Sequence, residues 1–256
     1  MTSTTVSRAP ASGSATQKKA RKAPFPVELW RSDVGKKYVM AITGILLMGF
    51  VFFHMLGNLK MYVGPADFNH YAEWLRELLV PFLPRTWALW IMRIGLIGAF
   101  GLHILAAYSL TRVNIAASRG GHVGPSSRYK SRRDYIAANY ASRTMRWSGI
   151  IVALFLVWHL FDLSWTGTGY DYTRGEVYQN VDASLSRWPV ALLYIVANIA
   201  LAFHLFHGAW SLFQTMGWSN PRFNVWRRNF AIGFAAVVCI PNISFPIAVL
   251  TGVISS

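Results

Sequence analysis

The sequence predicts an all-α integral membrane protein whose core is a bundle of five transmembrane helices. Apolar residues make up 54% of the 256 residues, only 14% are charged, and 11 tryptophans suit the headgroup region of a bilayer. Such a chain has too little polar surface to cover a soluble globule. The formal net charge of +15 does not indicate a nucleic-acid partner, because the basic side chains fall in discrete segments between long apolar runs.

Residues 1–27 are rich in Ser, Thr, Ala, Lys and Arg and show no periodicity, which predicts a disordered basic tail. No apolar stretch follows soon enough for a cleaved secretory signal, so we expect this tail to be cytoplasmic. Residues 28–256 form the predicted membrane domain. Cys239 is the single cysteine, which excludes an iron–sulfur cluster held by this chain alone.

Five segments are apolar over enough residues to cross ~30 Å of hydrocarbon at ~1.5 Å per residue. They cover residues 38–62, 87–110, 147–165, 189–216 and 230–252. Pro241 and Pro246 interrupt the last segment and predict a kink there.

The connections between these segments differ in charge. Eight Lys or Arg residues precede the first span, eight lie between Arg112 and Arg146, and three lie in the fourth connection, whereas the other two connections hold five. Seven of the ten acidic residues lie on the side with fewer basic residues. The positive-inside rule therefore predicts a cytoplasmic N-terminus, an external C-terminus and a multi-pass protein of the inner (cytoplasmic) membrane.

Two connections have features of their own. The segment from Pro65 to Pro84 contains the amphipathic stretch HYAEWLRELLV, which we expect to lie in the outer membrane interface. The basic segment from Arg112 to Arg146 is either an ordinary positive-inside loop or a docking surface for a soluble partner.

The positions of the seven histidines give the main functional clue. His70 and His122 lie in loops, whereas the other five lie within the predicted spans. Ionisable side chains within a membrane are costly and usually face a cavity, a partner or a cofactor. These five are His54, His103, His159, His204 and His207.

Helical rise places four of these histidines at two depths. His54 and His159 lie ~24 and ~18 Å into spans that begin on the inside, and therefore share an outer level. His103 and His204 lie ~22–24 Å into spans that begin on the outside, and share an inner level. His207 follows His204 by three residues and points within ~60° of it, so it is either an alternative ligand or a hydrogen-bond partner.

A six-coordinate b-type haem needs two neutral imidazoles at one depth on facing helices. The pairs His54/His159 and His103/His204 meet this demand and predict two b haems with these four residues as iron ligands. A zinc site would instead gather three or four ligands at one level, and a proton relay would grade histidines along one path. Glycines near the ligands, such as Gly44, Gly57 and Gly208, fit a flat macrocycle and ordinary helix packing equally well.

Two stretches resemble the cytochrome b membrane anchor of succinate:quinone oxidoreductases, the succinate dehydrogenases and fumarate reductases. SDVGKKYVMAITGILLMGFVFFHMLGNL (32–59) is similar to the first helix of the five-helix, two-haem type, and FHLFHGAWSLFQTMGW (203–218) to its fourth helix. The resemblance covers most of residues 30–230, including the lone His103 and His159; the last helix matches loosely and the tail does not match. It implies that His204, directly after a phenylalanine, is the fourth-helix ligand, because some relatives carry asparagine at the position of His207.

The resemblance also implies partners and a route for electrons. A flavoprotein subunit oxidises succinate to fumarate in the tricarboxylic acid cycle, an iron–sulfur subunit collects the electrons, and this chain passes them through the inner and then the outer haem to a quinone, for which menaquinone is our first expectation. A further small membrane subunit is an open possibility. The basic inner segments would face the iron–sulfur subunit.

Quinone reduction consumes two protons, so its site should combine a carboxylate or phenol with an apolar slot. Candidates near the outer haem, each of which is also explained as part of a solvated rim, are Asn58, Tyr71, Glu73, Glu77 and Asp162.

Haem propionates favour cations. The candidate propionate contacts, besides His207, are Lys36, Lys37, Arg93, Arg143 and Arg146. Arg93 falls within a span and should need a counter-charge.

Two alternatives remain at this stage. The first is the dihaem anchor of another quinone-linked oxidoreductase, such as a nitrate reductase, formate dehydrogenase or hydrogenase, which also spaces histidines on four helices. The second is a haem-free transporter or structural membrane protein with core histidines, against which the lack of an evident inverted repeat weighs.

Overall fold

The computed structural model describes residues 24–119, 136–165, 168–218 and 220–256, and this part of the chain is all helical. Residues 1–23 of the predicted tail, and His122, lie outside the described residues. Five helices are long and apolar enough to cross a membrane, which confirms the predicted number of spans. They are α2 (Asp33–Asn58), α4 (Trp87–Arg119), α5 (Ile136–Leu160), α7 (Trp188–Thr215) and α8 (Asn224–Leu250).

Four of these helices extend beyond the predicted spans, and α2 begins five residues before position 38. Helix α4 continues nine residues past position 110, α5 begins eleven residues before 147, and α8 begins six residues before 230. The apolar composition marks only the part of a helix that crosses hydrocarbon, so polar turns at its ends escape detection. Helix α8 runs without interruption from Asn224 to Leu250, with Pro241 and Pro246 inside it.

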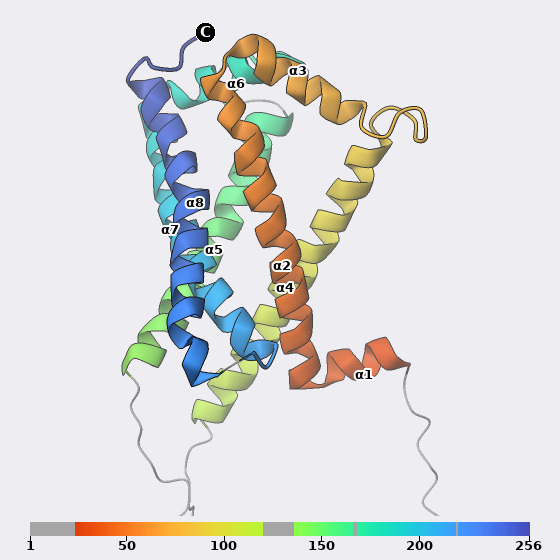
Figure 1. Cartoon of the computed structure of the whole chain (residues 1–256), viewed down its shortest axis with the longest axis vertical. Coiled ribbons are helices and arrows are strands. Elements are labelled where there is room, and N and C mark those ends of the chain that lie inside the picture. Colours follow the sequence, from red (N-terminus) through yellow and green to blue (C-terminus); the bar gives the residue numbers. More distant parts are fainter. Residues whose placement is uncertain (1–23, 120–135, 166–167, 219) are drawn as a thin grey trace, which may run out of the picture.

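The two ends of the bundle differ (Figure 1). Helix α1 (Phe25–Arg31) extends sideways from one end of the bundle, and the C-terminus lies at the opposite end. We name them the α1 end and the α3 end. The turn from α1 into α2 is tight: Ser32 caps α2 by accepting a hydrogen bond from the Gly35 N–H at 2.9 Å, and a Cβ at Gly35 would lie 1.9 Å from the Leu29 carbonyl oxygen.

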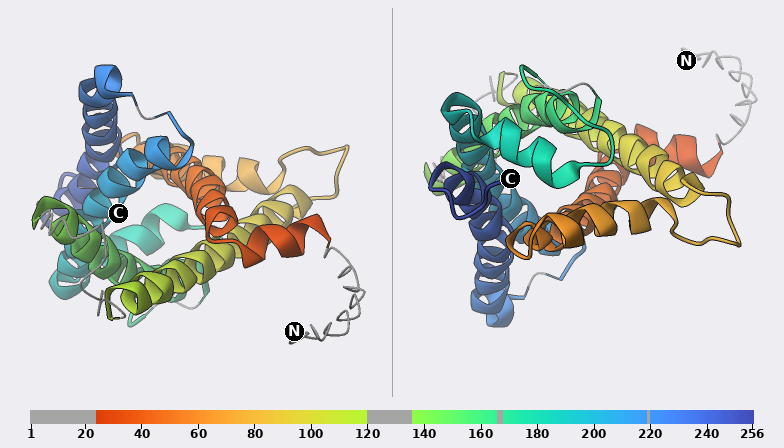
Figure 2. Two further views of the ribbon diagram at one scale, coloured as in Figure 1. Left: turned by 90° about the horizontal axis from the view of Figure 1, so that it is seen from below. Right: turned by 90° about the horizontal axis from the view of Figure 1, so that it is seen from above.

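Two shorter helices lie across the α3 end (Figures 1 and 2). Helix α3 (Pro65–Arg76) forms the first part of the predicted amphipathic stretch and begins after Gly64, whose φ of 128° suits glycine. Helix α6 (Val177–Leu185) was not predicted, because Gln179, Asn180, Asp182 and Ser184 hide its apolar face from a pattern search. The largest buried apolar cluster lies here and includes Phe68, Tyr178, Leu185, Tyr194 and Phe245.

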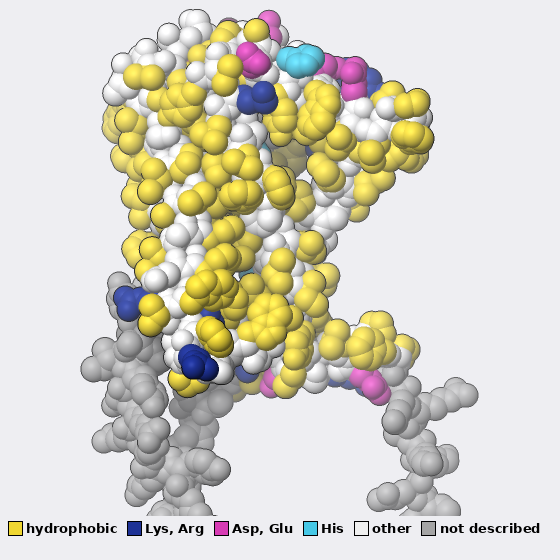
Figure 3. Space-filling model, in the orientation of Figure 1, with side chains coloured by type: hydrophobic (Ala, Val, Ile, Leu, Met, Phe, Trp, Pro, Cys, Tyr) yellow, Lys and Arg dark blue, Asp and Glu magenta, His cyan; other side chains and the backbone are white. Residues whose placement is uncertain are grey.

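The long helices pack mainly in three pairs: α2 with α4, α5 with α7, and α7 with α8. Helix α2 meets α7 and α8 less extensively. The bundle therefore consists of an α2/α4 unit and an α5/α7/α8 unit. Apolar side chains cover the middle of the face in Figure 3, while acidic side chains gather at the α3 end, as expected of a surface in contact with lipid.

Candidate functional site

Four of the histidines meet in two pairs inside the bundle. The ring centroids of His54 on α2 and His159 on α5 are 5.9 Å apart. Those of His103 on α4 and His204 on α7 are 6.3 Å apart. The structure thus brings together the same residues that the depth argument paired from the sequence.

The two pairs lie at different heights in the bundle. His103 contacts Thr43 of α2, which precedes His54 by 11 residues, and this corresponds to ~16 Å along the helix. His159 contacts Tyr194 of α7, which precedes His204 by ten residues, or ~15 Å. Two independent helices therefore give the same separation. We call His54/His159 the α3-end pair and His103/His204 the α1-end pair.

Each pair joins the two units of the bundle. The α3-end pair connects α2 to α5, and the α1-end pair connects α4 to α7, and neither connection is among the main helix-packing interfaces of the described residues. His54 is exposed and the other three are half-buried. Imidazoles at these depths need a polar partner or cofactor rather than hydrocarbon.

Three of the four imidazoles have Nδ1 in hydrogen-bond contact with a hydroxyl. The oxygen atoms are Thr43 Oγ1 for His103 at 3.1 Å, Ser148 Oγ for His204 at 3.5 Å and Tyr194 Oη for His159 at 3.3 Å. Each hydroxyl already donates its proton to another acceptor. Thr43 donates to the Val39 carbonyl, Ser148 to the Met145 carbonyl, and Tyr194 to Asp162. Each hydroxyl must therefore accept from an Nδ1–H, which leaves Nε2 of the imidazole as the free acceptor.

Asp162 lies one turn past His159 in a π-helical segment (Phe161–Trp165) and is fully buried, with 0% of its surface exposed. Four side chains donate to its carboxylate. Thr168 Oγ1 and Arg187 Nη2 lie 2.5 and 3.0 Å from Oδ1, and Ser184 Oγ and Tyr194 Oη lie 2.5 and 2.9 Å from Oδ2. Both oxygens of this predicted quinone-site candidate are thus engaged within the protein.

Tyr170 completes this cluster from the segment before α6. Its hydroxyl donates to the Asp162 backbone carbonyl at 2.6 Å, and its ring lies 5.1 Å from the Arg187 guanidinium. Burial, followed by the Asp162 carboxylate, raises the pKa of Tyr170 well above its usual range, which keeps this phenol protonated as a donor.

Glycines bring neighbouring helices close to the α1-end pair. A Cβ at Gly44 would lie 3.5 Å from His103 Cε1, and one at Gly149 would lie 3.3 Å from His204 Cε1. By contrast, a Cβ at Gly95, Gly98 or Gly101 on α4 would meet nothing within 4 Å. Gly149 therefore leaves room for the His204 imidazole, a Cβ at Gly44 would make an ordinary contact with His103, and the space for a Cβ at the three α4 glycines is open in the described part of the chain.

His207 is arranged differently from His204. Its Nε2 lies 3.0 Å from Thr144 Oγ1, so the nitrogen that the other histidines leave free is engaged here. This geometry favours His204 as the member of the α1-end pair and makes His207 a hydrogen-bond partner between α7 and α5.

The remaining quinone-site candidates lie at the α3 end. Tyr71 stacks on Trp74, and its ring is so close to α2 that a Cβ at Gly57 would lie 2.8 Å from it. Glu73 pairs with Arg76 at 2.7 Å and with Arg85, and Glu77 lies 3.7 Å from Arg85. Asn58 ends α2 and is half-buried. Among the described residues, no hydrogen bond or ion pair joins these four to the Asp162 cluster.

The candidate propionate contacts are scattered. Lys36 pairs with Asp33 at 3.3 Å, Lys37 and Arg146 are exposed, and the side chain of Arg143 lies outside the described residues. The Arg93 guanidinium lies 5.1 Å from the Trp90 ring. The counter-charge expected for Arg93 is not found among the described residues, where its guanidinium contacts an aromatic ring and forms no ion pair with an acid.

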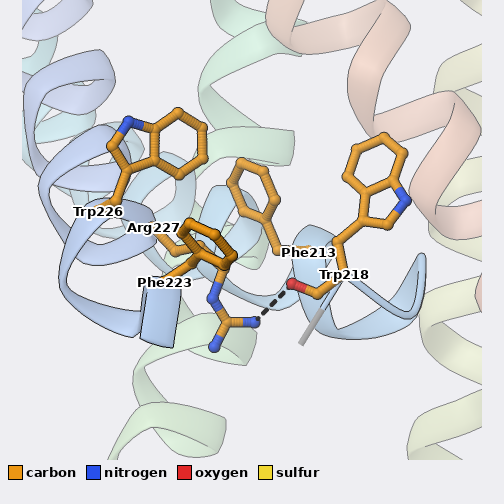
Figure 4. Close-up of a pocket in the computed structure, with 5 residues that line it drawn as sticks. All are labelled: Phe213, Trp218, Phe223, Trp226 and Arg227. Atoms are coloured by element: carbon orange, nitrogen blue, oxygen red, sulfur yellow. Dashed lines mark hydrogen bonds between the residues drawn. The ribbon is translucent and has the colours of Figure 1, made fainter. Parts of the chain in front are cut away.

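Arg227 is a residue that the sequence did not single out. Only 2% of it is exposed, and its guanidinium contacts the Trp218 carbonyl oxygen at 3.4 Å (Figure 4). The guanidinium also contacts Asn224 Oδ1 and the Trp210 ring. It lines an aromatic pocket of about 480 Å³ at the α1 end together with Phe213, Trp218, Phe223 and Trp226. Its position in a basic connection gave no signal of burial.

The arrangement favours pairwise coordination of a metal. Within the described part of the chain, no group of three or more His, Cys, Asp or Glu side chains gathers in a way that would hold a metal ion directly. The histidines could offer two nitrogen ligands at each of two levels, a donor set that would suit a metal whose other ligands come from a cofactor.

Residues 127–242 match the family model described as the succinate dehydrogenase/fumarate reductase transmembrane subunit. The matched segment holds His159, Asp162 and His204, whereas His54 and His103 precede it. No curated protein and no solved structure matches the chain. The match covers somewhat less than half of the chain and supports the resemblance found in the sequence.

Proposed function

We propose that this chain is the dihaem cytochrome b anchor of a succinate dehydrogenase, which carries electrons from a partner iron–sulfur subunit to a membrane quinone. The observation that carries the proposal is the pairing of four histidines from four spans at two heights. The family match supports the type of complex.

The spacing of each pair would leave room for a metal ion between the two imidazoles. A metal ion between two imidazoles, about 2 Å from each coordinating nitrogen, separates the ring centroids by about 6 Å. The observed separations are 5.9 and 6.3 Å. Two imidazoles joined by a direct hydrogen bond would not require room for a metal ion between them. Among the described residues, neither histidine pair forms a hydrogen bond between its two rings.

The protonation pattern supports the same assignment. Since Nδ1–H is donated to Thr43, Ser148 and Tyr194, the imidazoles of His103, His204 and His159 keep Nε2 as the unprotonated nitrogen that a metal ion requires. Such outer hydrogen bonds fix the tautomer and the ring orientation of metal-binding histidines.

When bound, the two b haems would supply reversible one-electron iron chemistry. The chain's own residues would hold the haems at two heights ~15 Å apart and keep them between its two helical units. We further propose that the α1 end faces the cytoplasm and docks the iron–sulfur subunit, because the basic residues concentrate there. The quinone, menaquinone in our proposal, would bind near the α3-end pair, where Asn58, Tyr71, Glu73 and Glu77 lie.

The test is the purification of the detergent-solubilised complex with its partners, followed by pyridine haemochrome analysis and reduced-minus-oxidised spectra. We expect two b haems per chain, both reducible by succinate, and a flavoprotein subunit. One haem per chain would show that one of the two histidine pairs does not bind haem. A colourless protein would favour a haem-free membrane protein, and co-purified molybdenum or nickel would indicate another quinone-linked oxidoreductase.

A further inference from the structure

The two histidine pairs differ in what supports their ligands. His159 contacts a phenol, Tyr194, whose proton goes to the buried Asp162 carboxylate. His103 and His204 contact Thr43 and Ser148, whose protons go to backbone carbonyls of their own helices. Only His159 is therefore linked to a charged group through its hydrogen bond. His54 stacks on Phe50 and forms no hydrogen bond to another described residue.

The number of protons on each group fixes the direction of the two hydrogen bonds that link His159, Tyr194 and Asp162. As the acceptor of Arg187, Thr168 and Ser184, Asp162 is a carboxylate that can only accept from Tyr194. Tyr194 has one proton, which it donates to Asp162 Oδ2, so its oxygen must accept the Nδ1–H of His159. The order is therefore His159 to Tyr194 to Asp162, with the negative charge at the far end.

We propose that Tyr194 and Asp162 are positioning residues that tune the redox potential of the haem at the α3-end pair. This inference rests on the proposed function. A carboxylate that polarises the hydrogen-bond acceptor of a ligand imidazole makes that imidazole more basic and a stronger electron donor. A stronger donor stabilises ferric relative to ferrous iron, so the relay lowers the potential of this haem and leaves the other unaffected.

The surrounding residues keep this relay in place. Arg187 and Thr168 occupy Oδ1 of Asp162, which leaves Oδ2 for Tyr194 and Ser184. The Tyr194 ring packs edge-on against Phe155, with centroids 4.9 Å apart, and belongs to the buried cluster at the α3 end. The phenol oxygen therefore has a fixed position between His159 and Asp162.

The test is a potentiometric titration of both haems in the purified complex carrying Tyr194→Phe, which removes one oxygen atom and keeps the packed ring. The wave of the α3-end haem is identified as the one missing from His54→Ala. We expect two haems per chain and a higher potential for this haem alone. About a tenfold change in its ferrous-to-ferric ratio at fixed ambient potential corresponds to about 59 mV for one electron.

Matched variants distinguish a specific change in the potential of the α3-end haem from a nonspecific effect of substitution on both haems. Thr43→Val should move only the other wave, because it removes the hydroxyl beside His103. Tyr178→Phe should move neither, since that phenol donates to the Ser255 carbonyl at 3.2 Å. An unchanged potential in Tyr194→Phe, or equal shifts of both waves, would overturn the relay.

A second variant decides the case in which Tyr194→Phe loses the haem altogether. Asp162→Asn retains the phenol beside His159 but removes the charge behind it, so a smaller upward shift of the same wave supports the relay and an unmoved wave overturns it. Failure of the proposed function looks different, because a wild-type complex without two b haems would give no pair of waves to compare.

Discussion

The α3-end pair and the α1-end pair hold the same kind of ligand by different means. At the α3 end, His159 is supported by a buried network that joins α5, α6 and α7 and includes two charged side chains. At the α1 end, His103 and His204 are supported by the hydroxyls of Thr43 and Ser148, by the backbone at Met40 and Met145, and by the space beside Gly149. The first arrangement depends on residues far apart in sequence, whereas the second depends on which small residues face each imidazole.

The largest expected effect comes from removing a ligand. His159→Ala should lose the haem of the α3-end pair and keep the other, and His204→Ala should do the reverse, because each haem depends on its own two imidazoles. Pyridine haemochrome analysis of the purified variants should give one haem per chain instead of two. Retention of both haems in either variant would contradict the pairing.

The next largest effect is expected at Asp162. Asp162→Ala would leave Arg187, Ser184, Thr168 and Tyr194 without their buried acceptor, and the loss of one partner from a buried charge pair costs about 3–5 kcal/mol. We expect a clear fall in the thermal unfolding midpoint of the complex in detergent. The matched control is Glu77→Gln on the exposed rim, where a change within about 0.5 kcal/mol is expected. Equal midpoints for both variants would show that the network contributes little to stability.

The two ends also differ in how far the sequence predicts them, because some of their features are set within one helix and others by contacts between distant segments. The five spans and the pairing of the histidines follow from apolar composition and helical rise, because both act along a single helix. The environment of Asp162 does not follow, since its donors come from segments separated by 6 to 32 residues and α6 has too many polar residues to be recognised. The burial of Arg227 depends on the packing of α7 against α8, which no local pattern specifies.

The α1-end pair should be sensitive to added volume. Gly149→Val places a branched side chain where even a Cβ would lie 3.3 Å from His204 Cε1, and overpacking of this kind costs about 1–3 kcal/mol. We expect a lower occupancy of the α1-end haem in this variant, measured as less than two haems per chain. Gly98→Val is the control, because a Cβ there meets nothing within 4 Å. Similar haem loss in both variants would indicate a general effect of valine in these helices.

The smallest effect is expected at His207, although it is only three residues from His204. Its Nε2 is bonded to Thr144, so His207→Ala should remove one hydrogen bond between α7 and α5, at a cost of about 1 kcal/mol, and retain both haems. The haem content of the preparation tests whether both haems are retained, and its thermal unfolding midpoint tests the small loss of stability. Loss of one haem, with retention of both in His204→Ala, would exchange the roles of the two residues. Because the α1-end pair was defined by His204, that result would move its ligand by almost one turn of α7 towards the α1 end and leave the α3-end pair as assigned.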